Sequence, residues 1–414
     1  MSEIDTSHLP PRGYLALLRE NRDFRSLYIA SLISLGGDWF LTVALLDLVL
    51  ELSGSAALAS LLIVFQTLPI FFATPFAGHV VDRMDRRKLM ITVDLVRCGA
   101  ALLPLAAVRP SLLVFAYLGV TIISLGAAWF NPASQAALPN LVEPHDLGRA
   151  NVLIGSAWGT MLAIGAGIGG IVTAQLGRNT SFVIDAFTFL VSALILLRIR
   201  RNFSEAESHT GERPPLIDSA LETVRYARRN PRVLALLLSK GGYGVGAGVV
   251  AMVSVFGREV FHRGAFGIGM LYAARGAGAL AGPFIVRALF RKDDEQYRSI
   301  SAAIVLFGIS YIGLALSPGL GFGVLAVLVA HLGGGAQWLV SSYGLQREVP
   351  DYIRGRVFAA DQGFVTLTIS VSSLATGLMA DAIGPSLATA IAASFCIAWG
   401  VVWGVRTRHL WRSE

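Results

Sequence analysis

The chain has 414 residues, of which 54% are hydrophobic and 15% are charged, and its formal net charge is +7. Soluble proteins carry about 25% charged residues, so this chain has too little polar surface to enclose a core in water. Glycine is also abundant, with 44 residues, whereas cysteine occurs only twice. This composition excludes a water-soluble enzyme, a disulfide-rich secreted module and a disordered chain, and it indicates many membrane spans.

Twelve apolar runs have the length of a membrane helix, which needs about 20 residues. A polar stretch at 198–232 divides them six and six, with a terminal segment at 1–25 and a tail at 406–414. We therefore predict an all-α membrane protein with twelve transmembrane helices in two pseudo-symmetric six-helix bundles, residues 26–197 and 233–405. The runs are 26–50, 56–81, 89–108, 111–130, 152–174, 182–197, 233–256, 266–289, 300–316, 321–340, 358–380 and 386–405.

The distribution of positive charge predicts the orientation. Of the 34 lysines and arginines, 27 fall in the termini and the even-numbered loops, and four fall in the odd-numbered loops. Because positive residues favour the cytoplasmic side, both termini and the linker at 198–232 should be cytoplasmic. The basic charge is then a topology signal and no nucleic-acid partner is expected. No cleavable signal peptide is visible. The excess of arginine over lysine fits the coding bias of a high-GC bacterium, and we expect a multi-pass protein of the bacterial inner membrane.

The two halves repeat each other in order. Gly126 and Trp129 recur as Gly335 and Trp338, at an offset of 209 residues. Two further segments recur in the same order. Gly148-Arg149 recurs as Gly355-Arg356 at an offset of 207 residues, and the loop at Gly78 recurs as the loop at Gly282 at an offset of 204. Homologous halves around a central cavity are the architecture of many secondary carriers, in which the substrate binds near the membrane midplane.

The loop between the second and third spans carries a motif of glycine, acid and arginines. It resembles the signature of the major facilitator superfamily: Gly78, three residues, Asp82-Arg83, two residues, then Arg86-Arg87. Glycine permits close approach of the two spans. The resemblance implies that Asp82 accepts hydrogen bonds from the amide end of the eleventh helix, starting near Arg356. Asp82 and its basic neighbours would then latch the cytoplasmic side shut.

The match has two departures. Asp85 stands where the family often has glycine, and we expect it to occupy the left-handed conformation of a tight loop, which aspartate tolerates. In the second half, Val286 aligns with Asp82, so the latch is single.

Other segments extend the resemblance over nearly the whole chain. Gly165, Gly169 and Gly170 are similar to a glycine signature of proton-linked drug exporters, although Ala166 replaces its proline. The same small residues would also serve as a helix-packing face, and both interpretations stay open. Segments 35–55, 131–151 and 354–358 look like the branch that contains macrolide-efflux proteins and the enterobactin exporter. This resemblance implies export of a small molecule.

Ionisable residues inside membrane spans are costly and are candidates for function. Asp38 lies about 18 Å into a span that is about 36 Å long, so it is the first candidate for proton coupling or for binding a cationic substrate. The alternative is that Asp38 is the structural partner of a buried arginine. Arg275 in the eighth span is its expected partner across the two halves. Breaking that pair by protonation or by substrate would drive transport.

The other intramembrane charges have mainly structural interpretations. Asp94 and Arg97 lie three residues apart on one helix face and should form an ion pair that supports the Asp82 latch. Lys240 should extend toward the cytoplasm. Asp47 and Asp185 lie nearer the outer end of their spans, where we expect water to reach them.

Several aromatic and polar residues could line the cavity for an amphipathic or cationic substrate. Packing or lipid contact is the alternative for the aromatic members. The candidates are Trp39, Gln66, Trp158, His331 and Gln337.

Three functions are compatible with the sequence. The leading hypothesis is a monomeric secondary transporter, not an enzyme, that exports a small, amphipathic, drug- or siderophore-like molecule by proton antiport and alternating access. A proton-independent uniporter or lipid-type flippase, with Asp38 and Arg275 permanently paired, is the second. A non-transporting receptor or scaffold is the third, and it would not need a polar midplane. The expected partners are a small-molecule substrate, protons and membrane lipids, with no cofactor and no metal.

Overall fold

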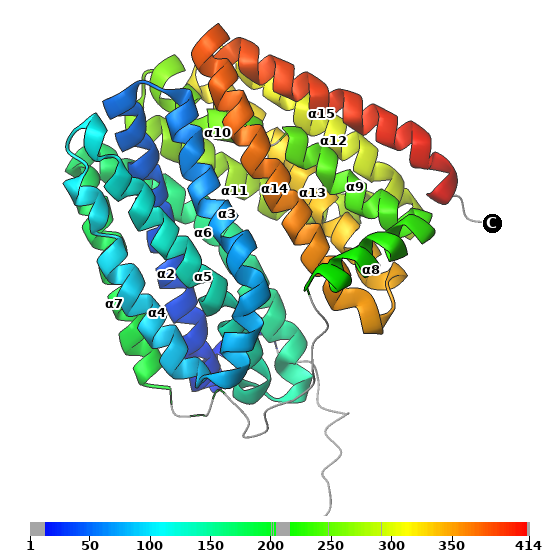
Figure 1. Ribbon diagram of the computed structural model, residues 1–414, viewed down its shortest axis with the longest axis horizontal. Coiled ribbons are helices and arrows are strands. Elements are labelled where there is room, and N and C mark those ends of the chain that lie inside the picture. The colour runs from blue at the N-terminus through cyan, green and yellow to red at the C-terminus, as the bar shows by residue number, and fades with distance from the viewer. Residues whose placement is uncertain are drawn as a thin grey trace, which may run out of the picture.

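A computed structural model of the chain describes residues 13–199, 201, 203, 216–246, 248–290 and 292–411. Every regular element within these residues is a helix, and the long helices run side by side (Figure 1). The first part contains α1 (Tyr14–Glu20), α2 (Arg22–Ser53), α3 (Ala56–Arg83), α4 (Arg86–Ala100), η2 (Leu103–Ala106), η3 (Pro110–Leu112), α5 (Val114–Leu141), η4 (Pro144–Asp146), α6 (Leu147–Leu176) and α7 (Arg178–Leu197). The second part contains α8 (Leu216–Arg229), α9 (Pro231–Gly246), α10 (Gly248–Val255), η5 (Phe256–Val260), α11 (Gly264–Leu289), α12 (Asp293–Ala315), α13 (Leu320–Glu348), α14 (Asp351–Ile383), α15 (Pro385–Thr407) and η6 (Arg408–Trp411).

Ten helical segments among the described residues are long and apolar enough to cross a membrane. The other two predicted spans correspond to α9 with α10 and to α11. The first of these is divided at residue 247, outside the described residues, into helices of 16 and 8 residues. Helix α11 has 26 residues, but its glycines and Arg275 lower its hydropathy. Every regular element in the described part of the chain is therefore helical, and ten of its segments are long and apolar enough for a membrane.

Helix boundaries differ from the apolar runs in both directions. The predicted span at 89–108 corresponds to a candidate membrane span at Arg86–Ala106, but its α-helical part, α4, stops at Ala100, and Pro104 lies in the short helix η2 that follows. Proline has no amide hydrogen and clashes with the preceding turn, so an α-helix rarely continues through it. Helix α14 is longer than its apolar run and begins at Asp351, which corrects the expected start near Arg356.

The same pattern of helix packing occurs in both parts. Helix α4 packs against α5 and α7, and α12 packs against α13 and α15. Likewise α2 packs against α6 and α7, and α9 packs against α14 and α15. The turn before the last long helix also matches, since Gly177 and Gly384 have φ angles of 84° and 88° that favour glycine.

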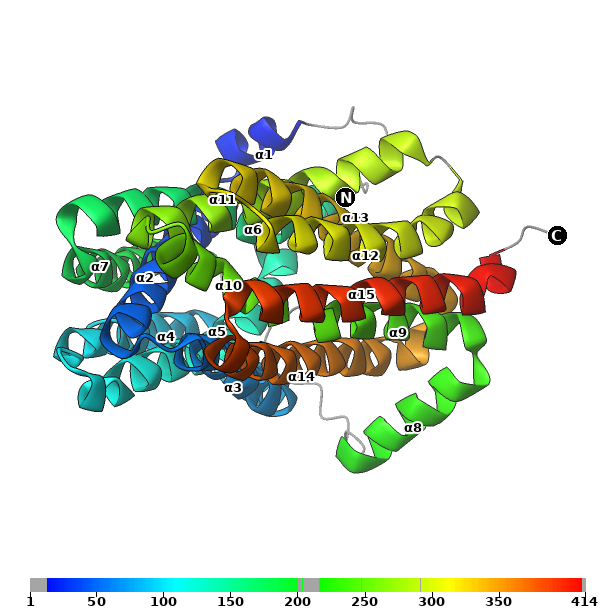
Figure 2. The same cartoon turned by 90° about the horizontal axis from the view of Figure 1, so that it is seen from above.

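The most extensive contacts between the parts are those of α3 with α14 and of α6 with α11. Both views place α3 beside α14 (Figures 1 and 2). Helices α6 and α11 meet at their backbones, because a Cβ atom added to Gly170 would lie 2.7 Å from the Cα of Gly269 and 2.8 Å from the carbonyl oxygen of Ala265. Small residues thus allow direct backbone contact between the two parts of the chain.

Candidate functional site

The first part of the chain contains a buried group of charges between α2 and α4. Nη2 of Arg97 donates to both carboxylate oxygens of Asp38, at 3.1 and 3.0 Å, and Nη1 lies 3.5 Å from Oδ1 of Asp94. The Arg97 side chain is 4% exposed, while those of Asp94 and Asp38 are 0% and 24% exposed. The Phe189 ring covers the guanidinium at 4.1 Å. The expected contact between Asp94 and Arg97 is present, but Arg97 also holds Asp38.

A third carboxylate belongs to this group. Asp185 of α7 is fully buried beside α2, where a Cβ atom on Gly37 would collide with it. Its Oδ1 lies 3.4 Å from the hydroxyl of Thr188, and its Oδ2 has no hydrogen-bond partner among the described residues. The expectation that water reaches Asp185 is wrong, since α2 and α7 pack over it. We call Asp38, Asp94, Arg97 and Asp185 the acid–arginine cluster.

Arg275 does not pair with Asp38, which corrects the sequence prediction. Its guanidinium carbon lies 5.9 Å from the centre of the Trp158 ring and 5.6 Å from that of Tyr272, within cation–π distance. Trp39 contacts both rings, at centroid distances of 6.2 Å to Trp158 and 5.8 Å to Tyr272. Asp38 pairs instead with Arg97 of α4, in its own half of the chain. The result is an aromatic group around Arg275 that joins α2, α6 and α11.

The polar residues expected to line a cavity fall into two sets. Gln66 is half-buried and its amide donates to the hydroxyl of Thr42 at 2.8 Å. His331 and Gln337 are 2% and 1% exposed, so the prediction that they line an open cavity is wrong. His331 hydrogen-bonds the hydroxyl of Tyr311 at 3.0 Å, which places it in the packing between α12 and α13. Gln337 is likewise enclosed between helices.

The described side chains of the signature loop make mainly local contacts. Nη1 of Arg86 donates to the carbonyls of Ala136 and Phe203, at 2.8 and 3.0 Å. Arg87 donates to the carbonyl of Leu196 at 3.0 Å and to that of Leu197. These arginines therefore tie the start of α4 to carbonyls within the first part, and they do not reach α14 as a latch would require.

The rest of the signature lies partly outside the described residues. Gly78, Asp82 and Arg83 belong to α3 by their backbone, but their side chains are not among those described. Asp85 has φ −59° and accepts from the amide of Lys88 at 2.9 Å, so it caps the N-terminus of α4. The expected left-handed conformation of Asp85 is wrong.

The glycines of α6 pack against two different helices. A Cβ atom on Gly165 would lie 3.1 Å from the carbonyl oxygen of Gly36, and one on Gly169 would lie 2.9 Å from the Cα of Phe40, both on α2. Gly170 faces α11 instead. These contacts favour the packing interpretation of the motif.

Lys240 also departs from expectation. Its ammonium group does not extend toward the cytoplasm but forms an ion pair with Asp361 of α14, and both side chains are 1% exposed. It also donates to the hydroxyl of Ser342 at 3.0 Å. The second part thus has its own buried ion pair.

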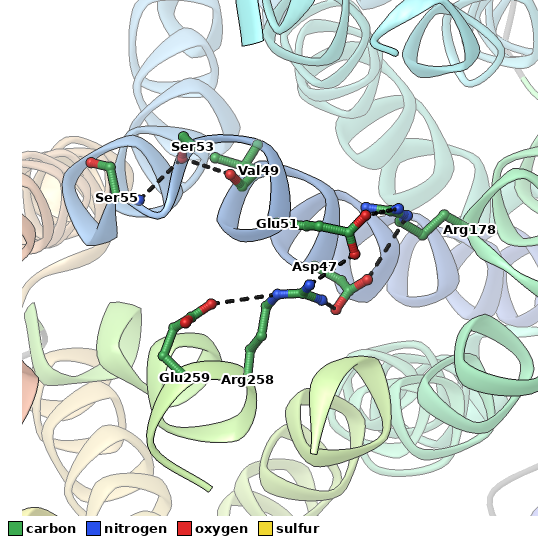
Figure 3. A network of polar contacts seen from close by, with 8 residues as sticks. All are labelled: Asp47, Val49, Glu51, Ser53, Ser55, Arg178, Arg258 and Glu259. Carbon is green, nitrogen blue, oxygen red and sulfur yellow. Dashed lines mark hydrogen bonds and ion pairs between the residues drawn. The ribbon is translucent and has the colours of Figure 1, made fainter. Parts of the chain in front are cut away.

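A network of ion pairs joins the two parts at one end of the molecule (Figure 3). Arg258 of η5 contacts Asp47 and lies 2.8 Å from Glu51, both of α2. Arg178 of α7 approaches the same acids, at 2.6 Å from Glu51 and 3.9 Å from Asp47. We call these four residues the clamp. They border a cavity of about 540 Å³. Asp47 is only 5% exposed, and it borders this cavity.

A second polar contact lies between the same two parts. Asp381 of α14 accepts from the amide of Ala56 and the hydroxyl of Ser55, each at 2.6 Å, and from the amide of Ala57 at 3.3 Å. These groups form the N-terminus of α3, where unpaired amides favour a carboxylate. The C-terminal end of α14 is therefore fastened to the start of α3.

Comparison with known proteins identifies the class. The chain is 27% identical over 401 residues to the MFS-type transporter YfiS of Bacillus subtilis (strain 168), covering 93% of each protein. It is 26% identical over 369 residues to macrolide efflux protein A of Streptococcus pyogenes, covering 87% of this chain and 90% of the relative. Among solved structures, a bacterial homologue of the human lysosomal transporter Spinster, inward-facing and unoccupied, superposes with a TM-score of 0.73, 15% identity and coverage of 98% and 100%. The protein is a multi-pass membrane transporter of the major facilitator type.

The family can be stated more closely. The profile of the family described as "Transmembrane secretion effector" matches residues 13–410, nearly the whole chain. The chain belongs to this family, and the efflux-type membership that its motifs predict is confirmed.

Sequence reasoning missed the clamp and the place of Asp185. A signal for the clamp was available, since Asp47 and Glu51 are four residues apart on one helix face. Arg178 and Arg258 both follow spans that end on the same predicted side. No comparable signal placed Asp185 against α2, because side-chain facing depends on how the helices are rotated.

Proposed function

We propose that this protein exports a small amphipathic molecule across the bacterial inner membrane by proton antiport. Membership of the family and the similarity to a macrolide efflux protein support export. The acid–arginine cluster is the observation that supports proton coupling. It brings the carboxyl groups of Asp38 and Asp94 to one guanidinium, and the buried carboxyl group of Asp185 lies nearby, all within long apolar helices.

The charges of the cluster explain why it would bind protons. With all three acids ionised, one arginine leaves two negative charges uncompensated at a buried site. Buried charges without partners are very costly, so the charges of these four groups balance only when protons occupy two of the three acids. Release of a proton would strengthen the attraction of Asp38 for Arg97, and uptake would weaken it. A proton can in this way change how α2 is held against α4.

The architecture we propose has twelve crossings in two six-helix bundles that rock by alternating access, with both termini cytoplasmic. The repeated packing of α4 and α12, and the matching turns at Gly177 and Gly384, support two related halves. The clamp and Asp381 then close the outer side, since they lie at the end of α2 away from the arginine-rich loops. Asp82 remains our proposed latch for the cytoplasmic side.

Proton-independent transport is the alternative, and the geometry of Asp38 favours it in one respect. Both oxygens of Asp38 accept from Nη2 of Arg97, which would suit a permanent ion pair. In that case the cluster would be structural and the carrier a uniporter or a lipid-type flippase. Asp38 is nevertheless 24% exposed, so a proton can reach it.

The test compares Asp38→Asn and Asp185→Asn with wild type in proteoliposomes. An imposed pH gradient should drive uptake of an exported drug by wild type, while both variants should lose gradient-driven flux and keep exchange without a gradient. Asp351→Asn is the matched control, because Asp351 is 95% exposed and pairs only with Arg354 among the described residues. Wild-type flux that is unchanged by the pH gradient would refute proton antiport and favour the uniporter.

A further inference from the structure

Arg275 lies deep in helix α11 without an anionic partner among the described residues. It is the twelfth residue of the 26-residue helix α11, about 16 Å from the start of a helix about 39 Å long. No ion pair or hydrogen bond joins its guanidinium to another residue in the part of the chain that the structure describes. Asp38, the acid expected to compensate it, is held by Arg97. A charge at this depth is costly unless a counter-ion or water meets it.

Aromatic rings hold this guanidinium from two directions. Trp158 and Tyr272 lie within 6 Å of it, and Trp39 supports both rings from α2. Trp158 is 46% exposed and Arg275 is half-buried, so a small molecule can reach them. Contacts with ring faces use none of the guanidinium's N–H donors. Those donors stay available for a planar anion, which arginine binds through two parallel hydrogen bonds.

We propose that Arg275, Trp158 and Tyr272 form the substrate subsite, and that it selects amphipathic anions: compounds with a carboxylate or similar acidic group on an aromatic or planar body. The anionic group occupies the N–H edge of Arg275, and the planar body lies against the exposed face of Trp158. A cation is disfavoured, because Arg275 already occupies the aromatic faces that would attract it. This inference rests on the proposed export function and adds the class of the exported compound.

The position of the subsite couples binding to movement. Trp158 belongs to α6 and Arg275 to α11, and these helices touch at their backbones, where a Cβ atom on Gly276 would lie 2.7 Å from the Cα of Ala163. A compound seated on both side chains contacts both parts of the chain. The affinity of the compound therefore depends on how the two parts are placed relative to each other. The difference in its binding free energy between two placements is also the amount by which the bound compound favours one placement over the other.

The test uses three probes that share one ring system and differ in charge: 2-naphthoate, 2-naphthylmethanol and 2-naphthylmethylammonium. Binding to the full chain in nanodiscs of zwitterionic lipid is measured by equilibrium dialysis without a pH gradient, and protein-free nanodiscs correct for lipid partition. Wild type should bind naphthoate at least 10-fold more tightly than the alcohol. Arg275→Gln should abolish this preference, and Arg275→Lys should retain part of it. Trp158→Leu should weaken the binding of all three probes but retain the preference for the anion.

Arg263→Gln is the control, since Arg263 also lies on the second part but near the clamp. Its binding should match wild type. The inference is overturned if wild type fails to bind naphthoate, does not distinguish the three probes or prefers the ammonium, or if folded Arg275→Gln keeps the anion preference. If Arg275→Gln does not fold, the wild-type comparison and Arg275→Lys decide. Because binding is measured without a gradient, wild-type flux that does not respond to a pH gradient would refute the proposed antiport and leave this subsite intact.

Discussion

Loss of Arg258 should open the outer end of the molecule. Arg258 is the member of the clamp that belongs to the second part, and it contacts both Asp47 and Glu51 of α2. Arg258→Gln removes the cation and leaves the two acids facing Arg178 alone. We therefore expect the state with the outer end closed to lose stability relative to the state with that end open.

The exposure of the side chains sets the magnitude. Asp47 is 8% exposed in its side chain, Arg258 20% and Glu51 44%. Exposed pairs contribute about 0–1 kcal/mol and breaking a buried pair costs about 3–5 kcal/mol. The exposure of the clamp lies between these two cases, and solvent screens Glu51. We therefore expect Arg258→Gln to destabilise the state with the outer end closed by about 2 kcal/mol, which shifts the equilibrium between the closed and open states about 30-fold.

Cysteine labelling measures this shift. Ala265, which lines the cavity beside the clamp and is 5% exposed, is changed to cysteine in a chain where Cys98 and Cys396 are replaced by alanine. A membrane-impermeant maleimide should react about 30-fold faster in the Arg258→Gln background. Added salt should accelerate labelling of the parent and have little effect on the variant.

Arg263→Gln again provides the control, because Arg263 borders the same cavity and makes no ion pair with the residues that the structure describes. Equal labelling of Arg258→Gln and its parent, or an equal acceleration by Arg263→Gln, would show that the clamp does not hold this end closed.

Two further changes test the packing and the acid–arginine cluster. Gly170→Ala should lower thermal stability and transport flux, because the added methyl group would meet backbone atoms of α11 and overpacking costs about 1–3 kcal/mol. Gly155→Ala is the control, since nothing lies within 4 Å of a Cβ atom there, and it should leave both quantities unchanged in the same melting and transport assays. Arg97→Gln should destabilise the protein by about 3–5 kcal/mol, since it leaves buried acids without a partner, and adding Asp38→Asn should restore part of that loss. A double variant no more stable than Arg97→Gln in a detergent melting series would contradict the pairing.

Composition and apolar length determined the fold class of this protein, and its local motifs indicated the family. Hydrophobic runs report directly on membrane helices, because the bilayer excludes backbone without internal hydrogen bonds. The signature from Gly78 to Arg87 and the repeat at offsets near 207 residues are local patterns, so they could be recognised without coordinates. The pairing of Asp94 with Arg97 was also predictable, since a spacing of three residues places them on one helix face.

Tertiary structure alone decided which distant charges meet. Asp38 was predicted to face Arg275 but pairs with Arg97, and Asp185 was predicted to be near water but is buried against α2. A helix sequence gives the spacing of residues along one axis, but it does not fix the rotation of that helix against its neighbours. In this protein that rotation depends on contacts such as Gly170 with Gly269, where two backbones meet without side chains between them. The partners of buried charges follow from those contacts and were therefore invisible in the sequence.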